Sequence, residues 1–175
     1  MKSFRDLHEY SISHRSEFWS ECLEFLNLIT YGSYTEAVDE SQPIDAIPKW
    51  FNGLQLNFAE NILSGRQGAK GRGLPPREKR DDDVAVIEVR EGLGETVRYT
   101  WDRLRRDVAA LAAAMKAAGV QKGDRVMAVA SNCYRTLCVM LAITWLGGIF
   151  SSVSTDTGTQ GILARTLRIK PKVCQ

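Results

Sequence analysis

The sequence predicts an α/β protein in which a helical N-terminal region precedes the first part of a mostly parallel, incomplete sheet. Apolar residues recur at helical spacing in the first third of the chain, and short apolar strands alternate with amphipathic helices from residue 84 onward. A stretch rich in Gly, Pro and charge separates the two parts. We therefore expect a helical region at 1–63, a flexible linker or surface insertion at 64–83, and the truncated start of an α/β domain at 84–175.

The N-terminal region is rich in aromatic side chains. Over residues 15–28 they recur at three- and four-residue steps, which predicts a helix with one apolar face and with Ser13 capping its first turn. Packing in a core accounts for these aromatics. Pro43 and Pro48 then interrupt the helical pattern.

Residues 64–83 have a composition that cannot bury enough apolar surface to stay ordered. Six basic residues crowd into this stretch, but three aspartates at 81–83 follow directly and offset half of that charge. A solvated linker therefore explains the charges, with a binding patch as the alternative.

The α/β part begins with a predicted hairpin, whose strands at 84–89 and 96–99 flank a turn with two glycines. Thr100 is placed to cap the next helix, which has one apolar stripe and stops at Gly119. Residues 126–130 then read as a buried strand.

Asn132 is predicted to cap a helix at 133–146 that is apolar on nearly all sides. A strand at 149–153 completes a right-handed βαβ unit, and a helix at 160–168 follows. A last strand begins at Lys172, and the chain stops at Gln175. We therefore expect half a fold, with an unpaired sheet edge that promotes self-association.

Composition narrows the function classes. The net charge of +2, from 23 basic and 21 acidic residues, does not favour a nucleic-acid partner. The longest apolar run, 137–146, is far shorter than the ~20 residues of a membrane crossing. No secretory signal opens the chain, so we expect a cytoplasmic protein.

The residue types that hold metals or act as nucleophiles form no site pattern. The cysteines lack the paired spacing of a zinc site or a disulfide framework, so we expect reduced thiols. The two histidines, His8 and His14, are too few for a His-based metal site or triad. We therefore predict no metal site and no catalytic residue within the chain.

A βαβ unit raises the question of a nucleotide site, because ligands bind at the carboxyl ends of such strands. The loop after Ala130 reads SNCY and lacks the glycines that let a backbone approach a pyrophosphate. No GxxxxGK[ST], GxSxG or HExxH motif occurs in the chain. Composition and spacing alone indicate no more than an α/β protein.

Three segments carry a family resemblance. WFNGLQLNFAENIL, at 50–63, is similar to the segment that closes the N-terminal region of acetyl-CoA and acetoacetyl-CoA synthetases. YTWDRLRRDVAALAAAMKAAGVQKGDRV, at 99–126, resembles the helix and Lys-Gly-Asp turn of adenylate-forming acyl-CoA synthetases, and MLAITWLGGIFSSVSTDTG, at 140–158, resembles the helix and strand that follow. The pairs at 60–61 and 151–152 look more like the acetoacetyl-CoA branch.

The resemblance implies a ligase that uses ATP and Mg to convert acetoacetate, or a similar short acid, to an acyl-adenylate and then transfers the acyl group to CoA. The resemblance implies that 1–63 is an N-terminal helical region of the acetyl-CoA-synthetase type and that 84–175 begins an AMP-binding domain. It also implies an enzyme of lipid and ketone-body metabolism. The family's phosphate loop, adenine motifs and catalytic lysine have no counterpart in this chain. We therefore expect no ATP, Mg or CoA bound by the chain alone, and no activity.

One family site reaches the chain by resemblance. Ser154, Thr155 and Asp156 align by motif with a segment that lines the CoA pocket, although the family pattern has a proline and an aromatic residue that this chain lacks. The alternative is a plain strand-to-helix turn, with Asp156 or Thr157 as its cap.

Three hypotheses follow for the chain. It is the N-terminal part of an acetoacetate–CoA ligase, or it is a non-catalytic binding or regulatory module that pairs through its sheet edge. The third, an unrelated small ligand-binding protein, has the least support.

Overall fold

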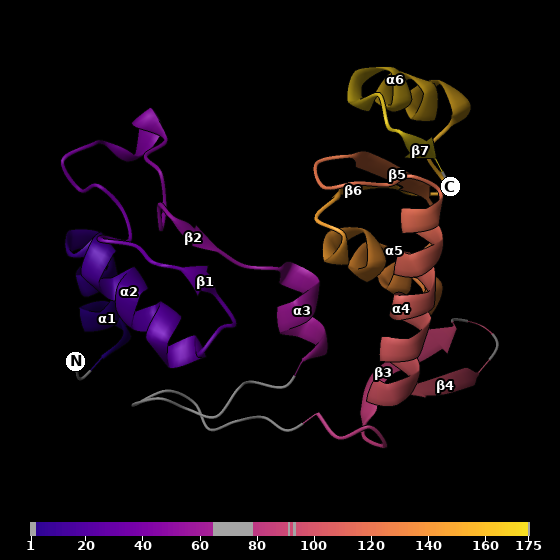
Figure 1. The fold of residues 1–175 in the computed structure, drawn as a ribbon, viewed down its shortest axis with the longest axis horizontal. Helices are drawn as coiled ribbons and strands as arrows, with labels where there is room; N and C mark the ends of the chain where they lie inside the picture. The colour runs from indigo at the N-terminus through magenta and orange to yellow at the C-terminus, as the bar shows by residue number, and fades with distance from the viewer. Residues whose placement is uncertain (1–2, 65–78, 91, 93, 175) are drawn as a thin grey trace. The chain divides into compact units, whose positions relative to one another are not determined.

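The computed structural model describes residues 3–64, 79–90, 92 and 94–174 (Figure 1). The chain divides into two compact units, one of which holds Met1–Leu56 and the other Asn57–Ser64 together with Lys79–Gln175. Most of the linker predicted at 64–83 lies outside the described residues.

The first unit holds short elements. They are α1 (Phe4–Ser13), α2 (Arg15–Leu26), the antiparallel pair β1 (Tyr31–Gly32) and β2 (Leu54–Gln55), and a 3-10 turn at Ile44–Ala46. The cap predicted at Ser13 is wrong, because Ser13 is the last residue of α1. His14 separates the two helices, and α2 has no side-chain cap. Ser3 and Asp6 instead form a capping box on α1.

The aromatic residues of the first unit do not form the expected core. No residue of α2 is buried, and Trp19 and Phe25 are 43% and 48% exposed. Trp19 makes edge-to-face contacts with Phe18 and Trp50, at centroid distances of 5.4 and 5.9 Å. Edge-to-face contacts between partly exposed aromatic rings thus take the place of a buried apolar core in this unit.

The second unit opens with α3 and a hairpin and then alternates helices with parallel strands. Its elements are α3 (Phe58–Leu63), β3 (Val84–Arg90), β4 (Glu95–Thr100), α4 (Trp101–Ala117), β5 (Arg125–Val129), α5 (Tyr134–Trp145), β6 (Ile149–Val153), α6 (Thr159–Ile169) and β7 (Val173–Cys174). β3 and β4 pair antiparallel, as the hairpin prediction requires. β5 pairs parallel with β6 and with β7, so the strand order is β6-β5-β7.

Local signals place α4 and its neighbours. The Thr100 hydroxyl accepts a bond from the Arg103 amide, as predicted for the cap. Beyond the C-terminus of α4, Gly119 takes a φ of 89°, which is the left-handed conformation of a helix stop. The parallel pairing of β5 with β6 and with β7 confirms the predicted α/β fold with its mostly parallel sheet.

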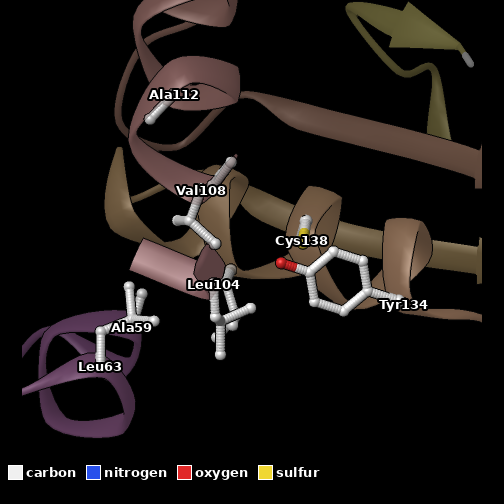
Figure 2. Packing of buried hydrophobic residues seen from close by; sticks show 9 residues of the cluster. Ala59, Leu63, Leu104, Val108, Ala112, Tyr134 and Cys138 are labelled. Atoms are coloured by element: carbon white, nitrogen blue, oxygen red, sulfur yellow. The ribbon is translucent and has the colours of Figure 1, made fainter. Parts of the chain in front are cut away.

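The core of the second unit lies between α3, α4 and α5, and Figure 2 shows side chains from all three helices meeting there. Leu141 and Ala142 are fully buried, and Leu104 and Val108 on α4 are 2% and 1% exposed. A second cluster, with Val126 and Ile143, joins α5 to the sheet. Apolar burial therefore holds this unit together.

α3 is fastened to the second unit at both ends. The Asn57 side-chain amide donates to the carbonyls of Thr144 and Trp145, at 3.2 and 2.9 Å, and its oxygen accepts from the Glu60 amide. At the other end Lys79 donates to carbonyls that include Ser64, and Arg105 donates to the Leu63 carbonyl at 3.1 Å. These bonds cap helix termini that would otherwise leave backbone groups unsatisfied.

Candidate functional site

A groove of about 660 Å³ lies in the second unit where β5 and β6 end. This is the place at which open parallel sheets bind ligands. The groove is lined by β3, the β5–α5 loop, the first turns of α5 and the end of β6. Its lining residues are Val86, Ile87, Glu88, Val89, Ala130, Ser131, Asn132, Cys133, Tyr134, Thr136, Leu137, Met140, Phe150, Ser152, Val153 and Ser154.

The β5–α5 loop forms one side of the groove and is held by a threonine. The Thr136 hydroxyl donates to the Ser131 carbonyl at 2.8 Å and lies 3.4 Å from the Cys133 sulfur. Cys133, not the predicted Asn132, is the N-cap of α5. Bonds from Thr136 lower the pKa of the Cys133 thiol against the effect of burial.

The β6–α6 turn brings only part of the predicted site to the groove. Ser154 lines it, whereas Thr155 and Asp156 do not, and all three residues are exposed. The Ser154 hydroxyl donates to the Asp156 carboxylate, and the Thr157 amide donates to the Ser154 carbonyl at 3.2 Å. Gly158 is the N-cap of α6, so the alternative cap at Asp156 or Thr157 is not present.

A pair of stacked tyrosines joins the hairpin to the helices beside the groove. The rings of Tyr99 and Tyr134 are 3.5 Å apart at centroid and nearly parallel. The Tyr99 hydroxyl donates to Glu88 at 3.0 Å, and the Tyr134 hydroxyl donates to Asp107 at 3.0 Å. Burial raises the pKa of Tyr134, so its hydroxyl stays protonated as a donor. Sequence spacing carried no signal for this pair.

The groove does not fit a magnesium triphosphate. Among the described residues that line it, Glu88 is the only charged one, and none is a lysine or arginine that could offset phosphate charge. Among the residues that the structure describes, no three His, Cys, Asp or Glu side chains gather as metal ligands. The hydroxyls, thiol and apolar side chains suit an uncharged, partly apolar part of a ligand.

Two further features concern the cysteines and the helices. None of the four cysteines forms a disulfide in the structure. Within the described part of the chain, no helix combines the length and the apolar character that a bilayer crossing requires.

Two family models match the chain one after the other. The model for the acetyl-coenzyme A synthetase N-terminus matches residues 4–62, and the model for AMP-binding enzymes matches residues 76–174.

Individual relatives match along almost the whole chain. An acetoacetyl-CoA synthetase from Macaca fascicularis is 39% identical over 99% of this chain, and a malonamoyl-CoA synthetase from Penicillium aethiopicum is 36% identical over 99%. The chain spans 24% and 23% of those relatives, about a quarter of their length. A solved acetoacetyl-CoA synthetase from Streptomyces lividans matches with a TM-score of 0.84 at 30% identity, over 99% of this chain and 25% of that one.

Proposed function

Since this chain belongs to the family of AMP-binding enzymes, we propose that it is the N-terminal part of an acetoacetate–CoA ligase. The observation that carries the proposal is its similarity to an acetoacetyl-CoA synthetase over 99% of its length. The model for the acetyl-coenzyme A synthetase N-terminus also precedes the model for AMP-binding enzymes along the chain. This order supports an N-terminal region at 1–63 and the start of an AMP-binding domain at 84–175.

The proposed reaction has two steps. The acid attacks ATP, complexed with Mg, and forms an acyl-adenylate and pyrophosphate. The CoA thiol then attacks the acyl carbon, and AMP leaves. Adenylation is needed because a carboxylate is unreactive toward a thiol, whereas AMP is a good leaving group.

Acetoacetate is the proposed acid, and a similar short acid is the alternative. The similarity to acetoacetyl-CoA synthetases supports acetoacetate, while the 36% identical malonamoyl-CoA synthetase supports a neighbour of the same size. Acetoacetate as substrate supports a role in lipid or ketone-body metabolism, and the cytoplasm is the proposed compartment. The near balance of 23 basic and 21 acidic residues gives no reason to expect a nucleic-acid partner.

Ser154, Thr155 and Asp156 are the proposed CoA-pocket segment. Ser154 lies at the groove, and the exposed turn offers hydroxyls and a carboxylate next to it. In an active ligase that contains this chain, Thr155→Val and Asp156→Asn should raise the KM for CoA and leave the KM for acetoacetate unchanged. Thr159→Val, at the start of α6, is the matched control.

The chain alone should not turn over acetoacetate. Its groove lacks the cations that a triphosphate requires, and its sequence lacks a phosphate loop. The non-catalytic alternative is a binding or regulatory module that self-associates. It draws support from the outer edges of β6 and β7, which pair with no other described strand. A monodisperse monomer in light scattering would count against that alternative.

The decisive experiment exchanges this chain for the matched quarter of the Streptomyces lividans enzyme. We expect the chimera to consume ATP, CoA and acetoacetate together, while the isolated chain does not. A folded chimera that binds none of the three would contradict the proposal. Sequencing the transcript past the codon for Gln175 gives an independent check, because a ligase requires a Ser/Thr/Gly-rich loop followed by lysine.

A further inference from the structure

A second groove, of about 410 Å³, lies between α3, α4 and α5. It is lined by Leu63, Ser64, Arg105, Val108, Ala109, Ala112, Ala113, Lys116, Trp145 and Leu146, and it shares no lining residue with the groove at the strand ends. Its volume falls within the range of roughly 300–1,000 Å³ that is typical of small-molecule sites, which also occur between packed helices.

Small side chains on α4 form the floor of this groove. Ala109, Ala112 and Ala113 are three and four residues apart, so they share one face of the helix and leave space that larger side chains would fill. Trp145, at the end of α5, forms part of the wall and is 46% exposed. The groove therefore presents an apolar surface to solvent.

The charge at the groove is positive. The described residues that line it include two cations and no carboxylate. Arg105 is engaged, because it donates to the Leu63 carbonyl and to the Asp81 carboxylate. The ammonium of Lys116, in the last turn of α4, has no partner among the residues that the structure describes. One cation at the groove is thus available for an anionic group.

We propose that this groove binds an amphiphilic carboxylate, such as a medium-chain fatty acid. The aliphatic chain lies on the alanine floor against Trp145, where burial removes apolar surface from water. The carboxylate pairs with the Lys116 ammonium. The site does not depend on the proposed ligase function, because none of its residues lines the groove at the strand ends.

The test titrates the chain with octanoate and follows heat release and tryptophan fluorescence. We expect saturable binding with a Kd of about 1 mM or tighter, given the affinity available to so small a ligand. Ala113→Leu fills the floor and should abolish binding. Ala114→Leu makes the same change at a neighbouring exposed position outside the groove and should leave binding unchanged.

The charge is tested separately. Lys116→Gln should weaken octanoate binding roughly two- to fivefold, as expected for a solvent-exposed ion pair, and should not weaken binding of the neutral octanamide. Arg168→Gln, an exposed cation on α6, is the control. Octanoate binding that fails to saturate below its micelle concentration, or that survives Ala113→Leu, would overturn the proposal.

Discussion

Different kinds of contact stabilise each of the two units of this chain. In the second unit, α3, α4 and α5 bury apolar side chains against one another and against the sheet. In the first unit, α1 and α2 contain no buried residue. Among the described hydrophobic residues of this unit, the buried ones are the small Ala37 and Val38. Bonds between side chains and backbone, together with aromatic edges, take the place of a core.

This difference predicts where each unit is vulnerable. A unit with an apolar core loses stability when a buried side chain is shortened. A unit with little core loses it when a buried backbone group is left without a partner. In the second unit, shortening a buried side chain should therefore lower stability more than removing a hydrogen-bond partner of the backbone. In the first unit, the order should be reversed.

The largest effect is expected in the core of the second unit. Leu141→Ala removes a fully buried side chain and should lower the free energy of unfolding by about 2–5 kcal/mol, measured by urea denaturation. Ile87→Ala, at a position that is 52% exposed, should change it by less than about 1 kcal/mol. Equal effects at both positions would mean that this unit has no specific core.

The first unit should respond most to a lost hydroxyl. The Ser16 hydroxyl accepts bonds from the amides of Ala37 and Val38, at 3.0 and 3.4 Å, and both residues are fully buried. Ser16→Ala leaves these amides unpaired and should cost about 1–3 kcal/mol.

Hydrogen exchange at residues 37 and 38 measures the effect of Ser16→Ala directly. The exposed Ser13 provides the control, because Ser13→Ala removes a hydroxyl from the end of α1 without touching those amides. Unchanged exchange in Ser16→Ala would show that something other than this hydroxyl holds the unit.

The attachment of α3 is the next test. Asn57 bridges the start of α3 and the end of α5, so Asn57→Ala should destabilise the helix by about 0.5–2 kcal/mol and speed amide exchange at 60–64. Asn132→Ala changes the same residue type at a position that is not the cap of α5 and should have almost no effect. A large effect of Asn132→Ala would mean that Asn132 caps α5, as the sequence predicted.

How much the sequence could predict depended on how local the deciding contact was. The cap at Thr100, the apolar stripe of α4 and the stop at Gly119 lie within one segment, and all three were predicted. Ser13 and Asn132 have the side chains of good caps, yet the chain enters each helix elsewhere. Residue type alone does not specify where that entry occurs.

The site shows the same limit. The general rule for parallel sheets directed attention to the strand ends, where the structure has a groove, although the loop after Ala130 carried no nucleotide-binding motif. Of the three residues that the resemblance assigned to a CoA pocket, only Ser154 lines this groove. The stacked Tyr99 and Tyr134 come from a strand and a distant helix, and the bond from Tyr134 to Asp107 joins two helices. Such pairs arise only when the elements have packed, so no local pattern predicted them.

The smallest expected effect is on the pH dependence of stability. It should occur in the second unit, because it depends on a partly buried carboxyl group there. Burial by itself would raise the pKa of Asp107, but bonds from Arg103, at 2.8 Å, and from Tyr134 outweigh it and hold the pKa below its usual range. A carboxyl with a lowered folded-state pKa contributes stability above the unfolded value of about 3.9 and loses it as the pH falls through the lower value.

Acidification from about pH 6 to pH 3 should therefore destabilise the second unit in part through Asp107. Asp107→Asn cannot titrate, so its unfolding free energy should fall less over that range, by a difference below about 1 kcal/mol for a pair at the surface. Asp82→Asn, at an exposed position outside the helices, should keep the full pH dependence. Identical pH profiles for Asp107→Asn and the unsubstituted chain would mean that the Asp107 carboxyl has the same pKa in the folded and unfolded states. The bonds from Arg103 and Tyr134 would then contribute no pH-dependent stability.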